Sequence, residues 1–503
     1  MERGKVFRGR LRKELHPSVI KHITEPYLYG AKKELSHHLY IHSAHVIMLK
    51  EQGLITANEA QIFSKGLSKL EKEDIYRSSL DVGTDLYMNL ETQLIKRVGE
   101  VGGKMHIGRS RNDIYATSLR MEVRSQILAT GDDLLQLIQA MLKVARNHFR
   151  TLMPGYTHWQ HAQPVTLAHY LTGVTQALGR DVHRLMMAYE HTNRCPLGAA
   201  ALATTGFLIN RERVADLLGF DGIVENSYDA VASRDFLAES ASALAILMTT
   251  LSRLVEDFII WNTLEFSFLN MPEEFSATSS IMPQKKNPIA LEHIKGRTGH
   301  VIAALVSVLT ILKGTSFSHN REIAGEVATG VHNAFGLVQG CLEMLCHLFP
   351  LLSFNTELIS RRTTQGFSTV TELTDLLVRE KGISFRQAHH IIGRVVNELT
   401  DKSQGIEHLS SAMIDHASKE VLGYELLIPE EAVRKALDPF FNIETREIIG
   451  GPGPRSVVTL ISHQKEELKQ KRDWLFQRRR DLDKAKETCQ EAQLQMISAS
   501  PKN

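Results

Sequence analysis

The chain has 503 residues, with 59 Lys plus Arg against 57 Asp plus Glu, and its formal net charge is only +2. This balance argues against a protein dedicated to binding nucleic acid or a membrane surface, because such partners favour strongly basic chains. The composition, 43% hydrophobic and 23% charged, is typical of a soluble globular protein and argues against a disordered one.

The cysteines and the apolar runs bear on the cellular compartment. Four scattered cysteines without a CxxC pair do not make a disulfide framework, so they favour a reducing, cytoplasmic setting. The basic N-terminal segment, residues 1–17, lacks the apolar stretch of a secretory signal. The most apolar run, Val301 to Leu312, is too short for the roughly 20 residues that span a bilayer. We expect it to form a helix buried on all sides within a large bundle.

Helical periodicity dominates the chain and predicts an all-α fold. Apolar residues recur at steps of three and four over residues 171–185, and residues 236–269 continue as a helical pattern almost without Gly or Pro. No alternating runs joined by Asn-Gly or Asp-Gly predict a hairpin, and no GxGxxG follows a strand pattern. These features together predict long bundle helices.

The charged tail, residues 463–503, carries Leu468, Leu475 and Leu482 at heptad spacing. Two interpretations remain open: a contact with another helix, including one between subunits, and an exposed, frayed helix. Nucleic-acid binding is disfavoured because acidic residues dilute the basic run Arg478–Arg480.

Two polar segments precede the middle of the chain. In Gly108–Asp113, Ser110, Arg111 and Asn112 stand where a long helix begins, and they can bind a carboxylate with the help of the helix dipole. An ordinary helix cap with a solvated arginine is the alternative. In Gly155–Pro164, His158 and His161 lie three residues apart, but no nearby Cys, Asp or Glu completes a metal-ligand set, so no metal is predicted.

Two further polar segments follow. Residues 276–288 form a long loop in which four hydroxyl side chains precede two lysines and an amide, an arrangement that suits a bound anion. The other segment is Gly206 to Asp235, which contains the polar run 225–235 with Arg234, and its alternative interpretation is an ordinary polar turn between helices.

Taken in chain order, these four segments resemble the fumarase/aspartase superfamily of lyases. The long loop resembles the signature SS-x-MP-x-K-x-NP followed by Glu, which here runs from Ser279 to Glu292. Its variable positions read MPQKKNP, as in argininosuccinate lyases, whereas fumarases typically read MPGKVNP and adenylosuccinate lyases MPHKRNP. The segments GRSRND and PGYTH resemble argininosuccinate lyases as well, and the resemblance covers about residues 30–460.

The resemblance implies an all-α, three-domain fold whose central domain is a bundle of five long helices. It also implies a homotetramer in which three subunits contribute to each active site. Together with the Gly and Pro breaks along the chain, it predicts an N-terminal helical domain (1–105), a central bundle (106–358), a C-terminal helical domain (359–462) and the charged tail (463–503).

The implied reaction is the reversible elimination of fumarate from an N-substituted aspartate, without a cofactor. Removing the weakly acidic proton beside a carboxylate puts negative charge on that carboxylate, so the site needs a base, an acid and stabilising cations or donors. By similarity Ser279 is the base, provided that a lysine and backbone amides stabilise its alkoxide. Lys285 and Asn287 would hold the carboxylate where charge develops.

Further roles are implied by the same resemblance. His158, paired with Glu292, would protonate or orient the leaving side, and the loop 276–288 would close as a lid. Ser110, Arg111, Asn112 and Thr157 would fix the succinyl carboxylates. The other expected substrate contacts are Gln284, Arg234, His319 and Lys32.

The chain departs from argininosuccinate lyases in the half of the site that receives the amine. Lys32 stands where those enzymes carry an Asp that helps to hold the guanidinium, and a cation there would repel it. The segment that begins at His319 places Ala324 and Val327 where the family has Gln and Lys, and His319 itself replaces a Tyr. We therefore expect fumarate plus arginine, as in arginine biosynthesis, or fumarate plus another amine, as in ethylenediamine-disuccinate lyases. A non-catalytic scaffold is disfavoured because Ser279 and the other catalytic candidates are retained.

Overall fold

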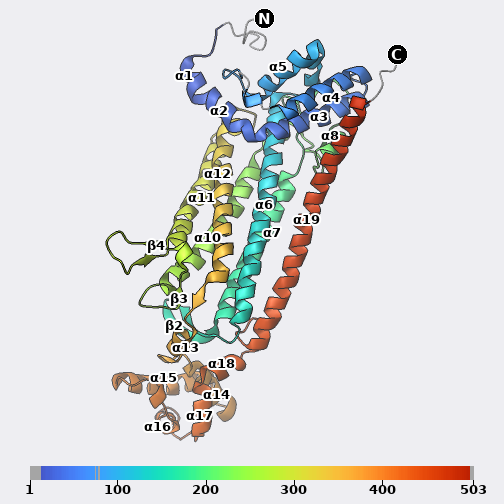
Figure 1. Cartoon of the computed structure of the whole chain (residues 1–503). Helices are drawn as coiled ribbons and strands as arrows, with labels where there is room; N and C mark the ends of the chain where they lie inside the picture. The colour runs from blue at the N-terminus through green and yellow to red at the C-terminus, as the bar shows by residue number, and fades with distance from the viewer. Residues whose placement is uncertain (1–12, 74, 78–79, 499–503) are drawn as a thin grey trace.

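The computed structural model describes residues 13–73, 75–77 and 80–498, so the first 12 residues of the basic N-terminal segment and the last five of the tail lie outside it. The described chain is almost entirely helical (Figure 1), which confirms the all-α prediction.

Five long helices form the central bundle. They pack around one large apolar core, with Leu171, Leu244 and Val331 among its fully buried residues. At 1.5 Å per residue, the 37 residues of the longest helix give it a length of about 55 Å. The helices are α6 (Arg111–Asn147), α7 (Leu167–Thr192), α10 (Asp235–Trp261), α11 (Ile289–Lys313) and α12 (Val327–Leu348).

Helix α10 is shorter than the sequence pattern predicts, since it ends at Trp261 and not near Leu269. Polar side chains compete for backbone groups at this point. The Asn262 side chain accepts a hydrogen bond from the amide of Met271 at 3.1 Å, and the Thr263 hydroxyl donates to the carbonyl of Ile260 at 2.7 Å. These bonds end the helix without Gly or Pro, which is why the prediction was wrong there.

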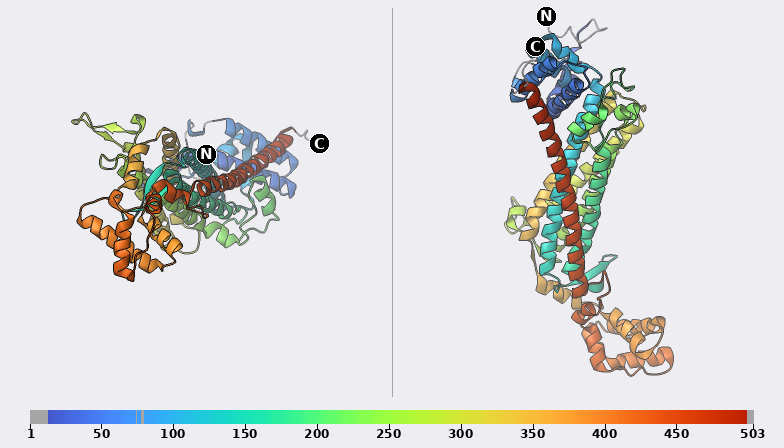
Figure 2. Two further views of the ribbon diagram at one scale, coloured as in Figure 1. Left: turned by 90° about the horizontal axis from the view of Figure 1, so that it is seen from below. Right: turned by 90° about the vertical axis from the view of Figure 1, so that its right-hand side faces the viewer.

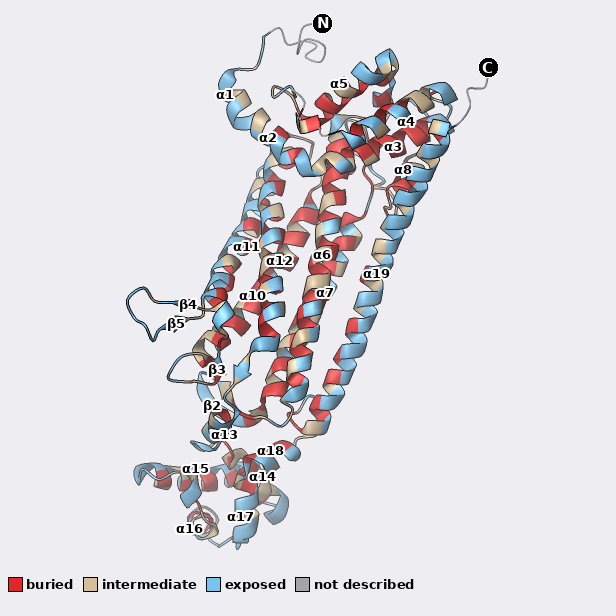
Figure 3. Ribbon diagram, viewed as in Figure 1, coloured by how far each residue is buried: buried red, intermediate tan, exposed pale blue. Residues whose placement is uncertain are grey.

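Helix α11 is not buried on all sides within the single chain, so that prediction was also wrong. Val301 and Val308 are fully buried, whereas Ile302, Val306 and Leu309 are 41%, 56% and 50% exposed. Figure 3 shows the exposed face along this helix. Helix α11 and the segment Glu322–Leu351 are long and apolar enough to cross a membrane by length and composition alone. Here both are bundle helices, and core helices of soluble proteins pass the same test.

Smaller helical layers lie at the two ends of the bundle (Figure 1). The N-terminal layer has an apolar core of its own, which includes buried residues of α8 (Arg211–Leu217), and the opposite layer has another. The helices of the N-terminal layer are α1 (Pro17–Val19), α2 (Glu25–Gly30), α3 (Leu35–Glu51), α4 (Ala57–Lys72), α5 (Leu86–Val98) and α8. The short helix α9 (Ser227–Ala232) lies between α8 and α10 in the chain. Its buried residues Ala230 and Val231 form a separate small cluster with Ala199. The opposite layer contains α13 (Thr356–Thr364), α14 (Val370–Lys381), α15 (Phe385–Asp401), α16 (Ser411–Leu422), α17 (Glu430–Leu437) and α18 (Pro439–Glu444).

Three short antiparallel strand pairs interrupt the helices. The strands β1 (Leu152–Thr157) and β2 (Gln160–Thr166) pair just after α6. The strands β4 (Ala277–Thr278) and β5 (Lys286–Asn287) pair at the base of the loop 276–288, and β3 (Leu269–Asn270) pairs with β6 (Ser353–Phe354).

The tail belongs to one long helix, α19 (Pro454–Ser498), which runs back along the bundle to the N-terminal layer (Figure 2). Leu468 and Leu475 are 7% and 2% exposed and join the bundle core. Trp474 packs edge-on against Tyr189 of α7, with ring centroids 5.4 Å apart. The heptad leucines therefore make a contact within the same chain, and the described part of the tail is not a frayed helix.

Candidate active site

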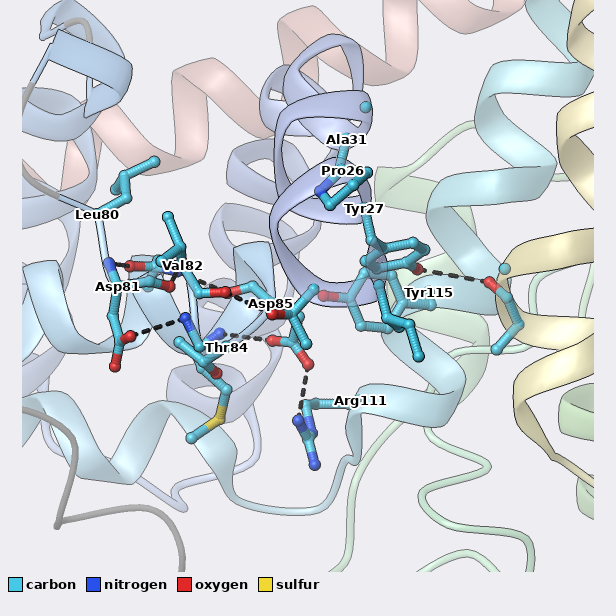
Figure 4. Close-up of a pocket in the computed structure, with 18 of the residues that line it drawn as sticks. Pro26, Tyr27, Ala31, Leu80, Asp81, Val82, Thr84, Asp85, Arg111 and Tyr115 are labelled. Atoms are coloured by element: carbon cyan, nitrogen blue, oxygen red, sulfur yellow. Dashed lines mark hydrogen bonds and ion pairs between the residues drawn. The ribbon is translucent and has the colours of Figure 1, made fainter. Parts of the chain in front are cut away.

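A cavity of about 1,900 Å³ lies between the N-terminal layer and the adjoining end of the bundle. Its wall is built from α2, the loop that precedes α5, the first turns of α6 and the short π-helix Glu322–Glu326. Figure 4 shows Tyr27 and Tyr115 beside each other on this wall, with Arg111 facing Asp85. Such a cavity is large enough for a small-molecule substrate.

The segment Gly108–Asp113 begins helix α6 at the cavity. The Ser110 hydroxyl caps the helix by accepting a hydrogen bond from the amide of Asn112, and the Asp113 carboxylate accepts one from the amide of Ser110 at 2.9 Å. Arg111 pairs with Asp85 at 2.7 Å, while Asn112 donates to the carbonyl of Ala201 at 3.1 Å. The cap thus presents Arg111 to the cavity at the positive end of the helix dipole.

Asp113 has a structural role that the sequence did not reveal. It is fully buried, and one carboxylate oxygen accepts the amides of Gly198 and Ala200 at 2.9 and 2.8 Å. The carboxylate therefore ties the start of α6 to a loop about 85 residues later in the chain. A lone Asp in a helix cap carries no sequence signal for that contact.

Arg234 and His319 lie at the same end of the bundle as Arg111. Arg234 lines the cavity, is almost fully buried, and donates to the carbonyl of Ser233 at 2.6 Å. Burial lowers its pKa to about 9. Burial, with help from the nearby Arg234, also lowers the pKa of His319 to about 4, so this imidazole is neutral at physiological pH.

Lys32 does not line the cavity. Its ammonium group lies 5.6 Å from the ring centroid of Tyr76, whereas its neighbours Lys33 and Glu34 are on the wall. Tyr27 is a wall residue that the sequence analysis missed. Its hydroxyl donates to the carbonyl of Ala324 at 3.4 Å, and its ring packs edge-on against Tyr115. A single Tyr in a short helix gives no pattern from which to find it.

The lid carries Ser279 on a well-defined turn. The Ser279 hydroxyl oxygen accepts hydrogen bonds from the amides of Met282 at 3.0 Å and Ile281 at 3.3 Å. These two donors would stabilise an alkoxide at this atom more than the neutral hydroxyl. Backbone amides are one of the two supports that a serine base requires, the other being a nearby cation.

The two consecutive lysines of the lid differ in what they contact. The Lys286 ammonium group donates to the carbonyl of Met271 at 2.7 Å and to the Asn270 side chain at 2.9 Å, so it fastens the lid to the bundle. Lys285 is exposed, and the described part of the chain offers it no ion pair. Only Lys285 is therefore available to a substrate or to Ser279.

The other lid residues lie near the base of the loop or project from it. Gln284 is exposed on the loop, and Asn287 is half-buried in β5 opposite Ala277. Glu292 is exposed in the first turn of α11. Within the described chain, no hydrogen bond joins Glu292 to His158.

Thr157 and His158 lie in the tight turn between β1 and β2. Thr157 pairs with Gln160, so the loop has only two residues, His158 and Trp159, with φ of 52° and 63°. Both angles are in the left-handed region, which such hairpins require and which costs non-glycine residues energy. Because the turn is His-Trp and not Asn-Gly, no hairpin could be predicted from the sequence. The strained turn holds the exposed His158 at the tip of the hairpin.

The predicted site residues fall into three groups at different levels of the bundle. Ser110 precedes α6 and Thr157 follows it, so the length of that helix, about 55 Å, separates them. The lid leaves the bundle between these levels (Figure 1). One chain thus brings Arg111, Arg234 and His319 to one end of the bundle, but it does not bring them to Ser279 or His158.

Comparisons with known proteins agree on the family. Residues 42–303 match the family model described as Lyase, and residues 367–444 match that described as Argininosuccinate lyase C-terminal. The chain is 43% identical to an argininosuccinate lyase from Methanosarcina barkeri over 429 residues, which is 84% of this chain and 86% of the relative. It is 39% identical to that of Methanocaldococcus jannaschii, covering 95% of this chain and 98% of the relative.

A solved structure gives the same result for the fold. The crystal structure of an EDDS lyase in complex with formate superposes with a TM-score of 0.86 at 33% sequence identity, and the match covers 96% of both chains.

Proposed function

This chain belongs to the argininosuccinate lyase family of carbon–nitrogen lyases, and on that premise we propose that it cleaves argininosuccinate reversibly into arginine and fumarate. The observation that carries the proposal is the lid: the MPQKKNP loop holds the Ser279 oxygen within hydrogen-bond distance of two backbone amides. A serine without such donors could not act as a base near neutral pH.

The chemical steps follow from these groups. The Ser279 alkoxide takes the proton from the carbon beside a succinyl carboxylate, and the electrons move onto that carboxylate. Lys285 and Asn287 stabilise the resulting charge, and the carbon–nitrogen bond then breaks as fumarate forms. Closure of the lid excludes water and brings Lys285 to the substrate.

The remaining groups bind the substrate or serve the leaving nitrogen. We assign Thr157, Ser110 and Asn112 to the succinyl carboxylates, with Arg111 as their cation. His158, with Glu292 beside it, protonates the departing nitrogen or orients the group that does so. Gln284 of the lid, Arg234 of the cavity wall and His319, which lies at the same end of the bundle, are assigned to the substrate as well.

We propose that the enzyme is a homotetramer whose active sites are shared between subunits. The separation of the three groups along the bundle supports sharing, because no single chain assembles them. The exposed stripe of Ile302, Val306 and Leu309 on α11 supports a subunit interface, since single chains rarely leave such an apolar row to water. Light scattering that gives the mass of a monomer under assay conditions would contradict this proposal.

The alternative substrate is an N-substituted aspartate with a different amine. Val327, which replaces the family's Lys, is 1% exposed and does not reach the cavity. Ala324 has no amide side chain like that of the Gln it replaces. It offers the cavity only its backbone carbonyl, which already accepts a hydrogen bond from the Tyr27 hydroxyl. These losses favour a changed amine, whereas the identity to argininosuccinate lyases favours arginine.

The test is a direct assay of fumarate. Purified protein is incubated with argininosuccinate, and fumarate is followed by its absorbance; in the reverse direction, fumarate is offered with arginine or with ethylenediamine. Turnover of argininosuccinate supports the proposal. Addition of ethylenediamine but not arginine would overturn it in favour of the alternative. We also propose a cytoplasmic location, which the free cysteines Cys195, Cys341, Cys346 and Cys489 support.

A further inference from the structure

Glu34 is an acidic side chain on the cavity wall that no step above uses. It lies in the short 3₁₀-helix Ala31–Glu34, and its side chain is 19% exposed. Its Oε2 accepts a hydrogen bond from the Ser118 hydroxyl at 3.3 Å and lies 3.9 Å from Nε2 of His38. Among the described residues, no Lys or Arg nitrogen lies within ion-pair distance of it, and the contacts with Ser118 and His38 both use Oε2. The other oxygen, Oε1, is therefore available to a ligand.

The surroundings of Glu34 do not neutralise its charge. The pKa of Glu34 is raised to about 7, chiefly by burial and in small part by the nearby Glu122, while the Ser118 hydrogen bond and Lys33 act in the opposite direction. His38 does not compensate, because burial lowers its pKa to about 3 and keeps it neutral. A partly desolvated carboxylate without a counter-ion is costly, so a cation that enters the cavity would bind there favourably.

The same wall also carries cations. The Arg321 guanidinium lies 6.0 Å from the ring centroid of Tyr27, and the Tyr27 hydroxyl interacts electrostatically with both Arg321 and Glu34. A carboxylate and a guanidinium that both lie near one aromatic residue of the cavity wall suit a zwitterionic ligand better than a simple diamine. A ligand guanidinium also matches a carboxylate in geometry, because it offers two parallel N–H donors.

We propose that Glu34 is a specificity-determining residue that binds the guanidinium of the arginine half of the substrate, while Arg321 receives its α-carboxylate. This inference rests on the proposed function. Glu34 then supplies the negative charge that Lys32, directed onto Tyr76, does not supply.

The experiment compares L-arginine with L-citrulline, its uncharged analogue of nearly equal shape. Both are titrated into the full-length protein without fumarate, so that no reaction can occur, and binding is followed by calorimetry. The wild type should bind arginine about 10- to 100-fold more tightly than citrulline, the range expected for a charge-assisted hydrogen bond. Glu34→Gln should remove most of this preference, and Glu34→Asp should retain it with weaker binding of both.

Glu122→Gln is the matched control, because Glu122 is a neighbouring half-buried acid that is absent from the cavity wall. Its charge opposes ionisation of Glu34, so its removal should leave arginine binding unchanged or tighter. A loss of binding equal to that of Glu34→Gln would mean that general disturbance of the fold is responsible.

The outcomes separate this inference from the proposed function. A wild type that binds citrulline as tightly as arginine, or a folded Glu34→Gln variant that keeps the preference, overturns the role of Glu34 even if argininosuccinate is cleaved. If Glu34→Gln does not fold, the wild-type ratio and Glu34→Asp still decide. A wild type that binds arginine selectively but does not cleave argininosuccinate would overturn the proposed reaction and leave the role of Glu34 standing.

Discussion

Leu475 is the place at which to test whether helix α19 fastens the N-terminal layer to the bundle. The side chain is 2% exposed in the bundle core, and it lies against Gly131 of α6. Replacing it with Ala removes about three buried methyl or methylene groups. At roughly 0.8 kcal/mol for each such group, the transfer term is about 2.4 kcal/mol. The cavity that remains raises the expected loss to the range of about 2.5–5 kcal/mol measured for buried leucines.

Leu494→Ala is the matched control, because Leu494 lies on the same helix but is 60% exposed. Both variants make the same change in helix propensity, so the difference between them isolates packing. Leu494→Ala should change the free energy of unfolding by less than about 0.5 kcal/mol. Urea unfolding at one fixed protein concentration, followed by circular dichroism, measures both losses under matched conditions.

The functional consequence follows from the position of the cavity. Cys489 and Met496, near the end of α19, are buried in the core of the N-terminal layer. Release of the helix should loosen that layer against the bundle, and the cavity lies between them. We therefore expect Leu475→Ala to raise KM for argininosuccinate more than it lowers kcat. Equal stabilities of the two variants would refute the claim that α19 stabilises the protein by packing against the bundle.

Three further predictions concern the reaction, the assembly and the pH. Ser279→Ala should lower kcat by at least about a thousand-fold with little change in Tm, because it removes the proposed base from an exposed loop; activity within ten-fold of wild type would exclude that base. Val306→Asp, which puts a charge into the apolar stripe of α11, should lower the mass found by light scattering, whereas Val458→Asp on the exposed face of α19 should not. Arginine binding should tighten as the pH rises through about 7, because the raised pKa of Glu34 leaves its carboxyl group neutral below that value and charged above it, while His38 stays neutral. Calorimetry at pH 6 and pH 8 on the wild type and on Glu34→Gln measures the effect. An equal gain in affinity in both proteins would assign the effect to another group.

The sequence predicted the helical class and the family because both depend on local patterns. Apolar spacing identifies a helix, and the MPQKKNP loop is contiguous in the chain. The end of α10 could not be predicted, since it depends on a bond from the Asn262 side chain to an amide nine residues away. The β1–β2 hairpin could not be predicted for a related reason. Its turn residues, His158 and Trp159, adopt a left-handed backbone conformation that is unfavourable for them and that only the surrounding fold stabilises.

The candidate site shows the same division between local and distant information. Ser279 and its two amides lie within four residues of one another, so a motif captures them. Glu34 and Tyr27 reach the cavity only because α2 and the following turn fold over α6 and the π-helix Glu322–Glu326. Lys32 illustrates the limit, because its position in the sequence suggested a wall residue, whereas its side chain faces Tyr76.

The length of the bundle gives the strongest physical reason for expecting shared sites. A substrate pocket of even 1,000 Å³ is only about 10 Å across. In contrast, α6 is about 55 Å long, with Ser110 before its first residue and the hairpin that carries Thr157 after its last. If both residues act on one substrate molecule, they must come from different chains. Bundles that pack antiparallel would place the beginning of one α6 beside the end of another, with the apolar stripe of α11 available to join them. If the serine, the histidine and the arginine serve one active site, the long helix α6 leaves the isolated chain incomplete, and assembly is the step that would bring the three residues together.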